Sequence, residues 1–349
     1  MGDLIYNNIP IIKLKEISLQ KKLPEPDFIA RMPKIDEIIE YNLAFYNFKE
    51  ENMIESPEKT EIFLHKTPDE IGQGCVTALK GKREYMEDTY QVASEFPYKF
   101  YAVYDGHGGS KVSELLQKDF HKYIFEALDR IPELKTEKSL LNLETIDKIK
   151  IEIIKAFELY DIYLYENKDK FGIKIDGSTA TVVVDIGNYL IFANLGDSRS
   201  ILIRDNRLEY STWDHKPEEE YRRILIAGSY VNKPWGSNIS RVGGILSVSR
   251  AFGDFIERLK IINGEYLGSN SPVSSKPDID IIKKNKEDNE YVVLASDGLW
   301  DVFSSQDITN NINEYIQKRG ISNTCKRLAN DAIEIRNSED NTTIMIFKV

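Results

Sequence analysis

Residues 100–109 read FYAVYDGHGG, an apolar run followed at once by an aspartate, a histidine and three glycines. A short run of aromatic and β-branched residues predicts a buried strand, and the glycines predict a turn at its end. The same arrangement recurs at Gly196-Asp197 and at Asp297-Gly298. A single Asp-Gly pair is usually a plain turn, but several at the ends of expected strands indicate a common purpose.

Similar short runs predict strands elsewhere in the chain. They lie at 75–79, 89–94, 180–186, 189–194, 200–204, 291–295 and 342–349. Apolar spacing predicts helices at about 110–129, 145–168, 305–318 and 322–336. Because hairpin connections dominate and the helices come in pairs, we expect an α+β domain built on antiparallel sheets and not a doubly wound parallel sheet.

The first part of the chain differs from the rest. We expect an N-terminal extension at 1–70 and a folded domain at 71–349. Within the extension, apolar residues at positions 35, 38, 39, 43 and 46 predict one amphipathic helix. Two interpretations stay open: a helix docked on the following domain, or a regulatory or partner-binding segment. The composition of 263–277 predicts a loop.

Composition excludes several classes of protein. Hydrophobic residues make up 41% of the 349 residues, which is enough for a core. The net charge of −11 argues against a nucleic-acid partner. No apolar run approaches the ~20 residues of a membrane span. The only cysteines, Cys75 and Cys325, favour an intracellular setting, in the cytoplasm or the nucleus, over a secreted disulfide scaffold.

Acidic residues at strand ends predict a metal site. Asp105, Asp197 and Asp297 each follow an expected strand, and Asp340 precedes the last one. Alternate strand ends of an antiparallel sheet share an edge, so these carboxylates are expected to converge and to repel one another unless a cation joins them. A ligand set of oxygen atoms favours Mg²⁺ or Mn²⁺, and Ca²⁺ less. The carbonyl of Gly106 is a further candidate ligand.

Three more side chains suit phosphate chemistry. Arg83 precedes Glu87 and Asp88 by four and five residues, and its planar fork matches two phosphate oxygens. The two acids stand directly before an expected strand and could point to the metal cluster, or all three could form a solvated turn. His107, on an exposed turn, can donate a proton to a leaving oxygen, although a lone histidine is more often structural.

Together these groups predict hydrolysis of a phosphate ester. Two ions about 3.5–4 Å apart can share a carboxylate and a water molecule, so we expect direct attack by a hydroxide that bridges them. Neither cysteine begins a C-x₅-R loop, because Gly81 and Asp331 occupy the arginine positions. A P-loop is also absent, which argues against a kinase or an NTPase.

The sequence closely resembles the metal-dependent serine/threonine protein phosphatases of type 2C, the PPM family, over roughly 74–349. Eight motifs occur in the family's order: Arg83–Asp88, Tyr104–Gly109, Gly177–Ala180, Gly196–Arg199, Asp214–Pro217, Ser249–Asp254, Ser296–Asp301 and Asp340-Asn341. The resemblance implies a central β-sandwich of two antiparallel sheets flanked by pairs of helices, with the metal site at one end. It also implies that 71–349 is the catalytic domain of a monomer acting on phosphorylated proteins.

The resemblance implies a role for each site residue. Asp105 would bridge both ions and Gly106 would offer its carbonyl. The remaining roles fall to Asp297 and Asp340 on the first ion, Glu87 and Asp88 on the second, Arg83 on the phosphate, His107 as general acid, and Asp197 with Asp297 or Asp301 on a third, weaker ion found in some members.

The chain departs from the family pattern in one region. Arg223-Ile224 arrives early and Ala227-Gly228-Ser229 replaces the usual Ala-Gly-Gly, both in the segment that forms a flap beside the site. Two other functions remain open: a non-catalytic binding module with the same fold, and a hydrolase of small phosphate esters.

Overall fold

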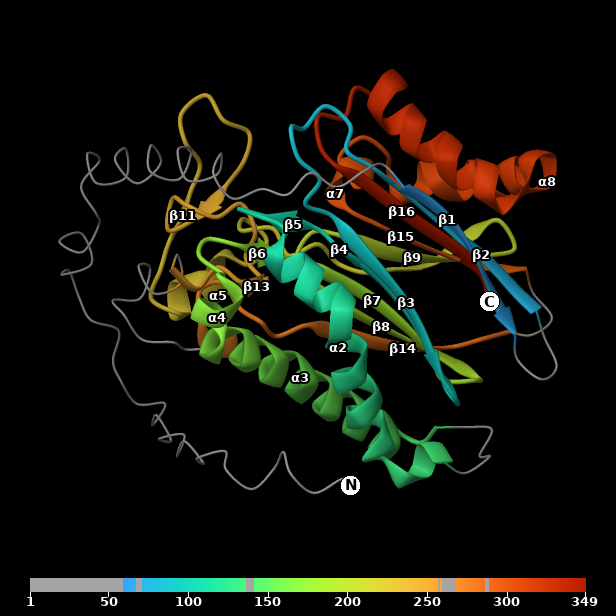
Figure 1. Ribbon diagram of the computed structural model, residues 1–349, viewed down its shortest axis with the longest axis horizontal. Helices are drawn as coiled ribbons and strands as arrows, with labels where there is room; N and C mark the ends of the chain where they lie inside the picture. The colour runs from blue at the N-terminus through green and yellow to red at the C-terminus, as the bar shows by residue number, and fades with distance from the viewer. Residues whose placement is uncertain (1–58, 67–70, 136–140, 257, 259–267, 286–288) are drawn as a thin grey trace. The chain divides into compact units, whose positions relative to one another are not determined.

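The computed structural model describes residues 59–66, 71–135, 141–256, 258, 268–285 and 289–349, with side chains from residue 74 onward. The amphipathic helix expected at 35–46 and most of the expected extension lie outside the described residues. The described chain forms two large antiparallel sheets and helices on both outer faces (Figure 1). The expected α+β sandwich is therefore confirmed.

One sheet has six strands. Their order is β1 (Lys59–Lys66), β2 (Ile71–Leu79), β16 (Thr342–Lys348), β15 (Glu290–Ala295), β9 (Arg199–Arg204) and β10 (Arg207–Ser211). β1 comes from the segment that we expected to be an extension, and it pairs along its whole length with β2, Lys59 opposite Ala78 and Lys66 opposite Ile71.

The other sheet has five strands. Their order is β14 (Asp278–Lys283), β8 (Tyr189–Leu195), β7 (Ala180–Asp185), β4 (Tyr98–Tyr104) and β3 (Thr89–Glu95). Its neighbouring strands also run antiparallel.

The alternation of side chains along β4 defines two cores. Successive residues of a strand point to opposite faces. Tyr101 and Val103 accordingly enter the layer between the sheets, where Tyr101 stacks on Phe347 with ring centroids 3.7 Å apart. Phe100 and Tyr104 point the other way, into the layer under the helices. Because both faces are buried, the strand reads as a continuous apolar run.

Helices cover the outer face of each sheet (Figure 1). α2 (Lys111–Asp129) and α3 (Leu143–Glu166) lie on the five-stranded sheet and share one buried cluster with it. α8 (Ser305–Asn330) lies on the six-stranded sheet and is broken at Gly320, whose φ is +77°. This break confirms the two expected helical runs, although the second one ends in a wider π-helical turn, η4 (Asp331–Ile335).

Short elements complete the described fold. They are β5 (Gly106–His107), β6 (Gly177–Ser178), β11 (Val231–Asn232), β12 (Arg241–Val242), β13 (Phe252–Gly253), α4 (Lys168–Phe171), α5 (Tyr221–Ile226), α7 (Asp297–Trp300), η2 (Pro132–Lys135) and η3 (Gly268–Asn270). η3 lies inside the loop expected at 263–277, of which 263–267 is outside the described residues. β5, β6 and β13 form a small sheet of their own.

In the two large sheets, the strands that sequence patterns missed lie at the edges. β1, β10 and β14 each have a neighbour on one side only. β14 carries acidic residues in alternation with isoleucine, because one of its faces is exposed. An edge strand needs fewer apolar residues than a central one, so its pattern resembles that of a loop.

The packing under the helices predicts a stability difference. Leu116 on α2 is fully buried, whereas Leu159 on α3 is 38% exposed. Leu116→Ala should lower the free energy of unfolding by about 2–5 kcal/mol, because a cavity remains in a packed layer. Leu159→Ala, with the same chemical change, should cost less than about 1 kcal/mol. Urea unfolding of both variants compares them, and equal losses would contradict the packing described here.

Candidate metal and phosphate site

Both large sheets carry carboxylates to the same end of the sandwich. Asp105 follows β4 and Asp197 follows β8, both in the five-stranded sheet. Asp297 follows β15 and Asp340 precedes β16, both in the six-stranded sheet. The connection between β2 and β3, which crosses from one sheet to the other, adds Glu87 and Asp88.

The pKa values of these acids show that they form one electrostatic cluster. Burial and then the charge of Asp297 raise the pKa of Asp105 well above its ordinary value, with further increases from Asp88, Asp340 and Asp197. Burial and then Asp197 raise the pKa of Asp297 in the same way. Like charges held together in a low dielectric favour the protonated form. These acids therefore meet in the structure as the sequence predicted.

Glu87 and Asp88 are held by hydrogen bonds and are nearly fully buried. The backbone N–H of Gly109 donates to Glu87 Oε1 over 2.8 Å, just before the N-terminus of α2. The Ser296 hydroxyl donates to Asp88 Oδ2 over 2.7 Å. Burial and then the charge of Asp340 nevertheless raise the pKa of Asp88 to about 7. The two acids therefore belong to the cluster and not to a solvated turn.

Arg83 binds the cluster from its open side. Its Nη2 donates to Asp340 Oδ2 over 2.5 Å, and its Nε donates to the carbonyl of Glu339 over 3.3 Å. Burial works against the charged guanidinium, but Asp340 and Glu87 outweigh it and raise the pKa of Arg83. Since 43% of the side chain is exposed, this cation faces the carboxylates and solvent together.

Asn341, just before β16, forms hydrogen bonds with the loop at residues 80–87. Its amide Nδ2 donates to the carbonyls of Lys80 and Tyr85 over 2.8 and 2.9 Å. Its Oδ1 accepts from the backbone N–H of Glu87 over 2.8 Å. Three backbone groups far away in the sequence thus depend on one buried amide, which fixes the loop between Arg83 and Glu87.

His107 contacts a carboxylate that the sequence analysis did not single out. Its Nε2 lies 2.9 Å from Oδ1 of Asp254, a fully buried residue. The small sheet brings the two together, since β5 pairs with β6 and β6 pairs with β13, which ends just before Asp254. Burial lowers the pKa of the imidazole, but Asp254 outweighs that effect and raises it.

Two glycines allow this close packing. A Cβ on Gly177 would lie 2.4 Å from His107 Nε2 and 2.5 Å from the Asp254 carboxyl carbon. A Cβ on Gly106 would lie 2.4 Å from the carbonyl oxygen of Glu87. The glycine beside Asp105 therefore serves a close approach of two backbone segments.

Asp197 and Asp301 lie on the side of Lys216. The Lys216 Nζ is 3.2 Å from Asp301 Oδ1. Burial raises the pKa of Asp197 to about 6, and Lys216 partly counters it. Asp301 is 60% exposed, so this part of the cluster opens to solvent.

The donor atoms suit a hard divalent cation, but each has another partner. No group of three or more His, Cys, Asp or Glu side chains in the described part of the chain is arranged to hold a metal ion directly. Arg83 binds Asp340, Ser296 binds Asp88 and Gly109 binds Glu87. Each of these contacts occupies one carboxylate oxygen, and an oxygen-only set whose charges repel one another fits Mg²⁺ or Mn²⁺.

The region that departs from the family pattern is anchored by charge. Arg250 Nη2 and Arg223 Nη2 lie 2.6 and 2.7 Å from the two carboxylate oxygens of Glu220. Burial alone would raise the pKa of Glu220, but hydrogen bonds from the two arginines lower it to about 2. Arg223, which arrives early in the sequence, also donates to the Ser249 carbonyl over 2.7 Å. Although Arg223 comes early after the Asp214–Pro217 motif, its segment is held in place by these ion pairs and hydrogen bonds.

Sequence reasoning missed three functional contacts. Asp254, Ser296 and Asn341 all stand inside the quoted motifs, but their partners are 147, 208 and 254 residues away. His215 also orders a loop, because its Nδ1 accepts from the Gly196 N–H. No local signal reports a partner at such distances.

Comparisons with known proteins agree with this geometry. The family model described as Protein phosphatase 2C matches residues 73–342. Protein phosphatase 1A of Homo sapiens is 30% identical over 283 residues, covering 78% of this chain and 69% of the relative. Protein phosphatase 1B of Rattus norvegicus is 32% identical over 286 residues, covering 78% and 68%.

A solved structure shares the fold. The crystal structure of serine-threonine phosphatase 2C from Toxoplasma gondii has a TM-score of 0.66 at 20% identity, and the match covers 84% of this chain and 99% of that one. The site and these matches define a metal-dependent phosphatase. The chain belongs to the protein phosphatase 2C family, whose members are Mg/Mn-dependent serine/threonine protein phosphatases acting on phosphoproteins. None of the helices in the described ranges has the length and apolar character to cross a membrane.

The role of Asn341 is testable. Asn341→Ala should lower the free energy of unfolding by about 1–3 kcal/mol, because it leaves buried backbone groups without partners. Asn310→Ala, at an exposed position of α8, should change it by less than about 0.5 kcal/mol. Chemical denaturation followed by tryptophan fluorescence measures the stability of both variants. An unchanged stability of Asn341→Ala would refute the stabilising role of the Asn341 hydrogen bonds.

Proposed function

We propose that this chain hydrolyses phosphoserine and phosphothreonine in proteins by direct attack of water, with two Mg²⁺ or Mn²⁺ ions and a third, weaker one at its site. The observation that supports it most is the cluster of mutually repelling carboxylates with Arg83 and His107 at its edge. When bound, the ions would supply activation of a water molecule and neutralise charge on the phosphoryl group.

Each side chain has a proposed place in this site. Asp105 would hold both main ions, and Gly106 would offer its carbonyl as a further ligand. The other proposed ligands are Asp297 and Asp340 for the first ion, Glu87 and Asp88 for the second, and Asp197 with Asp297 or Asp301 for the third. The hydrogen bonds to Glu87 and Asp88 hold their free oxygens in place, which limits the entropy lost on binding.

Arg83 orients the substrate. Its guanidinium is half exposed and is anchored to Asp340 and Glu339 on one edge. A phosphate at the mouth of the site meets a charged donor that is already fixed next to the cluster. Charge-assisted contacts of this kind are stronger than neutral ones and set the direction of the phosphoryl group.

His107 holds the proton that the leaving oxygen needs. The Asp254 carboxylate binds Nε2 and favours the charged imidazolium, which keeps the ring in one orientation. The proposed transfer goes from the imidazolium to the serine or threonine oxygen as its bond to phosphorus breaks. A positioned acid of this kind contributes about 10²–10⁴-fold to a rate.

The remaining parts of the proposal concern the setting. We propose that 71–349 is the catalytic domain, that 1–70 is an extension whose β1 adds a strand to the six-stranded sheet, and that the protein acts as a monomer in the cytoplasm or nucleus. Both cysteines are free and buried, in keeping with a reducing compartment.

The activity is tested with a phosphothreonine peptide. Turnover should require Mn²⁺ or Mg²⁺, and EDTA should abolish it. Asp297→Asn should lower kcat/KM by more than about 100-fold, since it removes a proposed direct ligand and not only a supporting contact. Asp147→Asn on the exposed face of α3 is the matched control. Folded protein that shows no turnover with either metal would refute the proposal.

The role of the histidine pair is tested through the leaving group. His107→Asn should slow the phosphothreonine peptide by about 100-fold or more and p-nitrophenyl phosphate far less, because an activated leaving group needs no proton. Asp254→Asn should show the same selective loss, about tenfold, since it releases the ring without removing the acid. Equal slowing of both substrates would contradict a proton-donating role, and p-nitrophenyl phosphate turnover exceeding that of the peptide would favour small esters as the substrates.

A further inference from the structure

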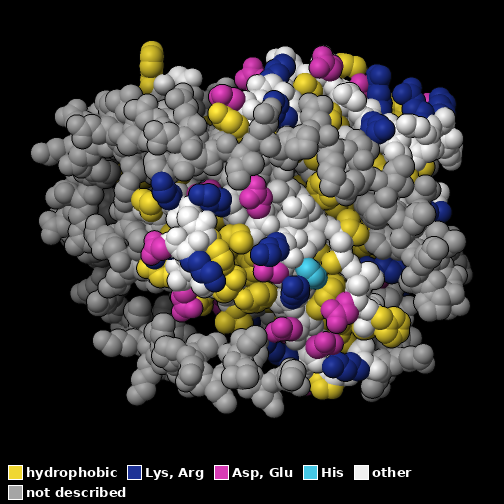
Figure 2. Space-filling view, in the orientation of Figure 1, with side chains coloured by type: hydrophobic (Ala, Val, Ile, Leu, Met, Phe, Trp, Pro, Cys, Tyr) yellow, Lys and Arg dark blue, Asp and Glu magenta, His cyan; other side chains and the backbone are white. Residues whose placement is uncertain are grey.

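A groove rich in cationic side chains lies on α8, on the outer face of the six-stranded sheet. Its volume is about 570 Å³. It is lined by Lys318, Arg319, Asn323, Lys326, Arg327 and Asn330. All six side chains are exposed, and none of the six is acidic. In Figure 2 Lys and Arg side chains gather over this helix, at the upper right of the view.

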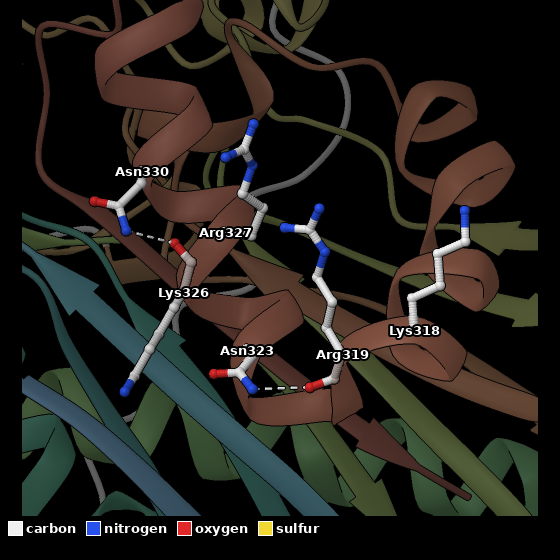
Figure 3. A pocket seen from close by; sticks show the side chains of 6 residues that line it. All are labelled: Lys318, Arg319, Asn323, Lys326, Arg327 and Asn330. Atoms are coloured by element: carbon white, nitrogen blue, oxygen red, sulfur yellow. Dashed lines mark hydrogen bonds between the residues drawn. The ribbon is translucent and has the colours of Figure 1, made fainter.

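The groove exists because the helix breaks. Gly320 has φ +77° and ψ 162°, values outside the helical range, and a Cβ added there would meet nothing within 4 Å. Glycine adopts this conformation without steric cost, whereas other residues do not. Lys318 and Arg319 stand before the break and the other lining residues after it, so two helical runs supply the lining (Figure 3).

The cations of the groove retain binding capacity. Lys318 pairs with Glu314, and Arg327 Nε lies 2.7 Å from Asp331 Oδ2. Arg319 and Lys326 form no ion pair with any residue in the ranges that the structure describes. Arg319 lies over the ring of Tyr315, with 5.9 Å to the ring centroid, which supports its guanidinium and leaves its donors outward.

The two asparagines complete the lining. Asn323 Nδ2 donates to the carbonyl of Arg319 and Asn330 Nδ2 donates to that of Lys326, each over 2.8 Å (Figure 3). These hydrogen bonds fix the orientation of the two amides. The Oδ1 of each asparagine can accept a hydrogen bond from a backbone N–H. Cations together with fixed acceptors suit an extended acidic peptide.

We infer that this groove docks an acidic segment of the phosphoprotein substrate, at a distance from the phosphorylated residue. The inference rests on the proposed function. The chain as a whole carries −11, so a long polyanion such as nucleic acid would be repelled outside the groove, whereas a short acidic segment meets four cations and their two acidic partners, Glu314 and Asp331. At physiological salt, charges act over about 8 Å, which keeps the groove's field local.

The geometry sets the spacing of the two sites in the substrate. Gly320 follows Ser305, the first residue of α8, by fifteen residues (320 − 305), which is about 22 Å along a helix. Asp301 of the cluster lies four residues before Ser305 (305 − 301). An extended chain covers about 3.3–3.6 Å per residue, so a peptide that runs along this part of the helix covers it with about seven residues.

The test uses three phosphothreonine peptides. The first carries six Asp/Glu residues twelve positions away from the phosphothreonine, the second carries Ser and Gln in their place, and the third is a short peptide without a tail. The variant Arg319→Glu/Lys326→Glu reverses the two cations that lack a described ion pair. The control Lys118→Glu/Lys122→Glu makes the same change in net charge at exposed positions of α2, on the other sheet.

For the unaltered protein, KM for the acidic peptide should be about fivefold below KM for the neutral one, since exposed ion pairs are individually weak and only Arg319 and Lys326 lack a described ion pair. Raising the salt should remove the difference. The α8 variant should lose the difference in KM between the acidic and neutral peptides, but its kcat/KM for the short peptide should not change. The α2 variant should keep both the difference in KM and the kcat/KM for the short peptide.

Other results would overturn the inference. If the α8 variant still prefers the acidic peptide to the neutral one, the acidic segment docks elsewhere. If the α2 variant loses this preference to the same extent as the α8 variant, the preference comes from the charge of the whole protein and not from the groove. An increase of kcat/KM on the short peptide in the α8 variant would mean that an acidic segment of this chain itself occupies the groove. Fluorescence anisotropy of the labelled acidic segment without phosphothreonine measures docking separately, so a failure of catalysis and a failure of docking are distinguished.

Discussion

Repulsion among partly buried carboxylates is the constraint around which this protein is built. Asp88 and Asp297 raise the pKa of Asp105, Asp88 also raises the pKa of Asp297, and burial raises both pKa values further. Such an arrangement disfavours the folded state unless positive charge or hydrogen-bond donors compensate it. Arg83, Ser296 and the backbone of Gly109 supply part of that compensation. Divalent ions bound at the proposed site would supply the rest of the compensating positive charge.

The cluster and the sandwich depend on the same feature of the sequence. Strands buried on both faces need uninterrupted apolar runs, and such runs end visibly where an aspartate and a glycine follow. This is why the strands that carry Asp105, Asp197 and Asp297 could be predicted together with their site. Edge strands such as β14 are half exposed and alternate with acidic residues, so the same reasoning does not find them.

Long-range partners are the part that a single sequence does not contain. His107 lies in β5 and Asp254 directly follows β13, and these two short strands are joined only through β6. Asn341 serves three backbone groups around residues 80–87, and nothing near it in the sequence indicates this. Resemblance to a family supplies roles for such residues, whereas the bonds that carry out those roles become visible only when the chain is folded.

The layer between the sheets has a consequence for ion choice. Asp105 stands four residues after Tyr101 on one sheet, and Tyr101 stacks directly on Phe347, which belongs to the strand that begins next to Asp340. The contact between these rings helps to fix the separation of the two sheets, and the sheets carry the proposed ligands. Mg²⁺ takes oxygen ligands at about 2.0–2.1 Å and Ca²⁺ at about 2.3–2.6 Å. A change in the packing of this layer would therefore alter the distances among the proposed ligands, on which the choice between these ions depends.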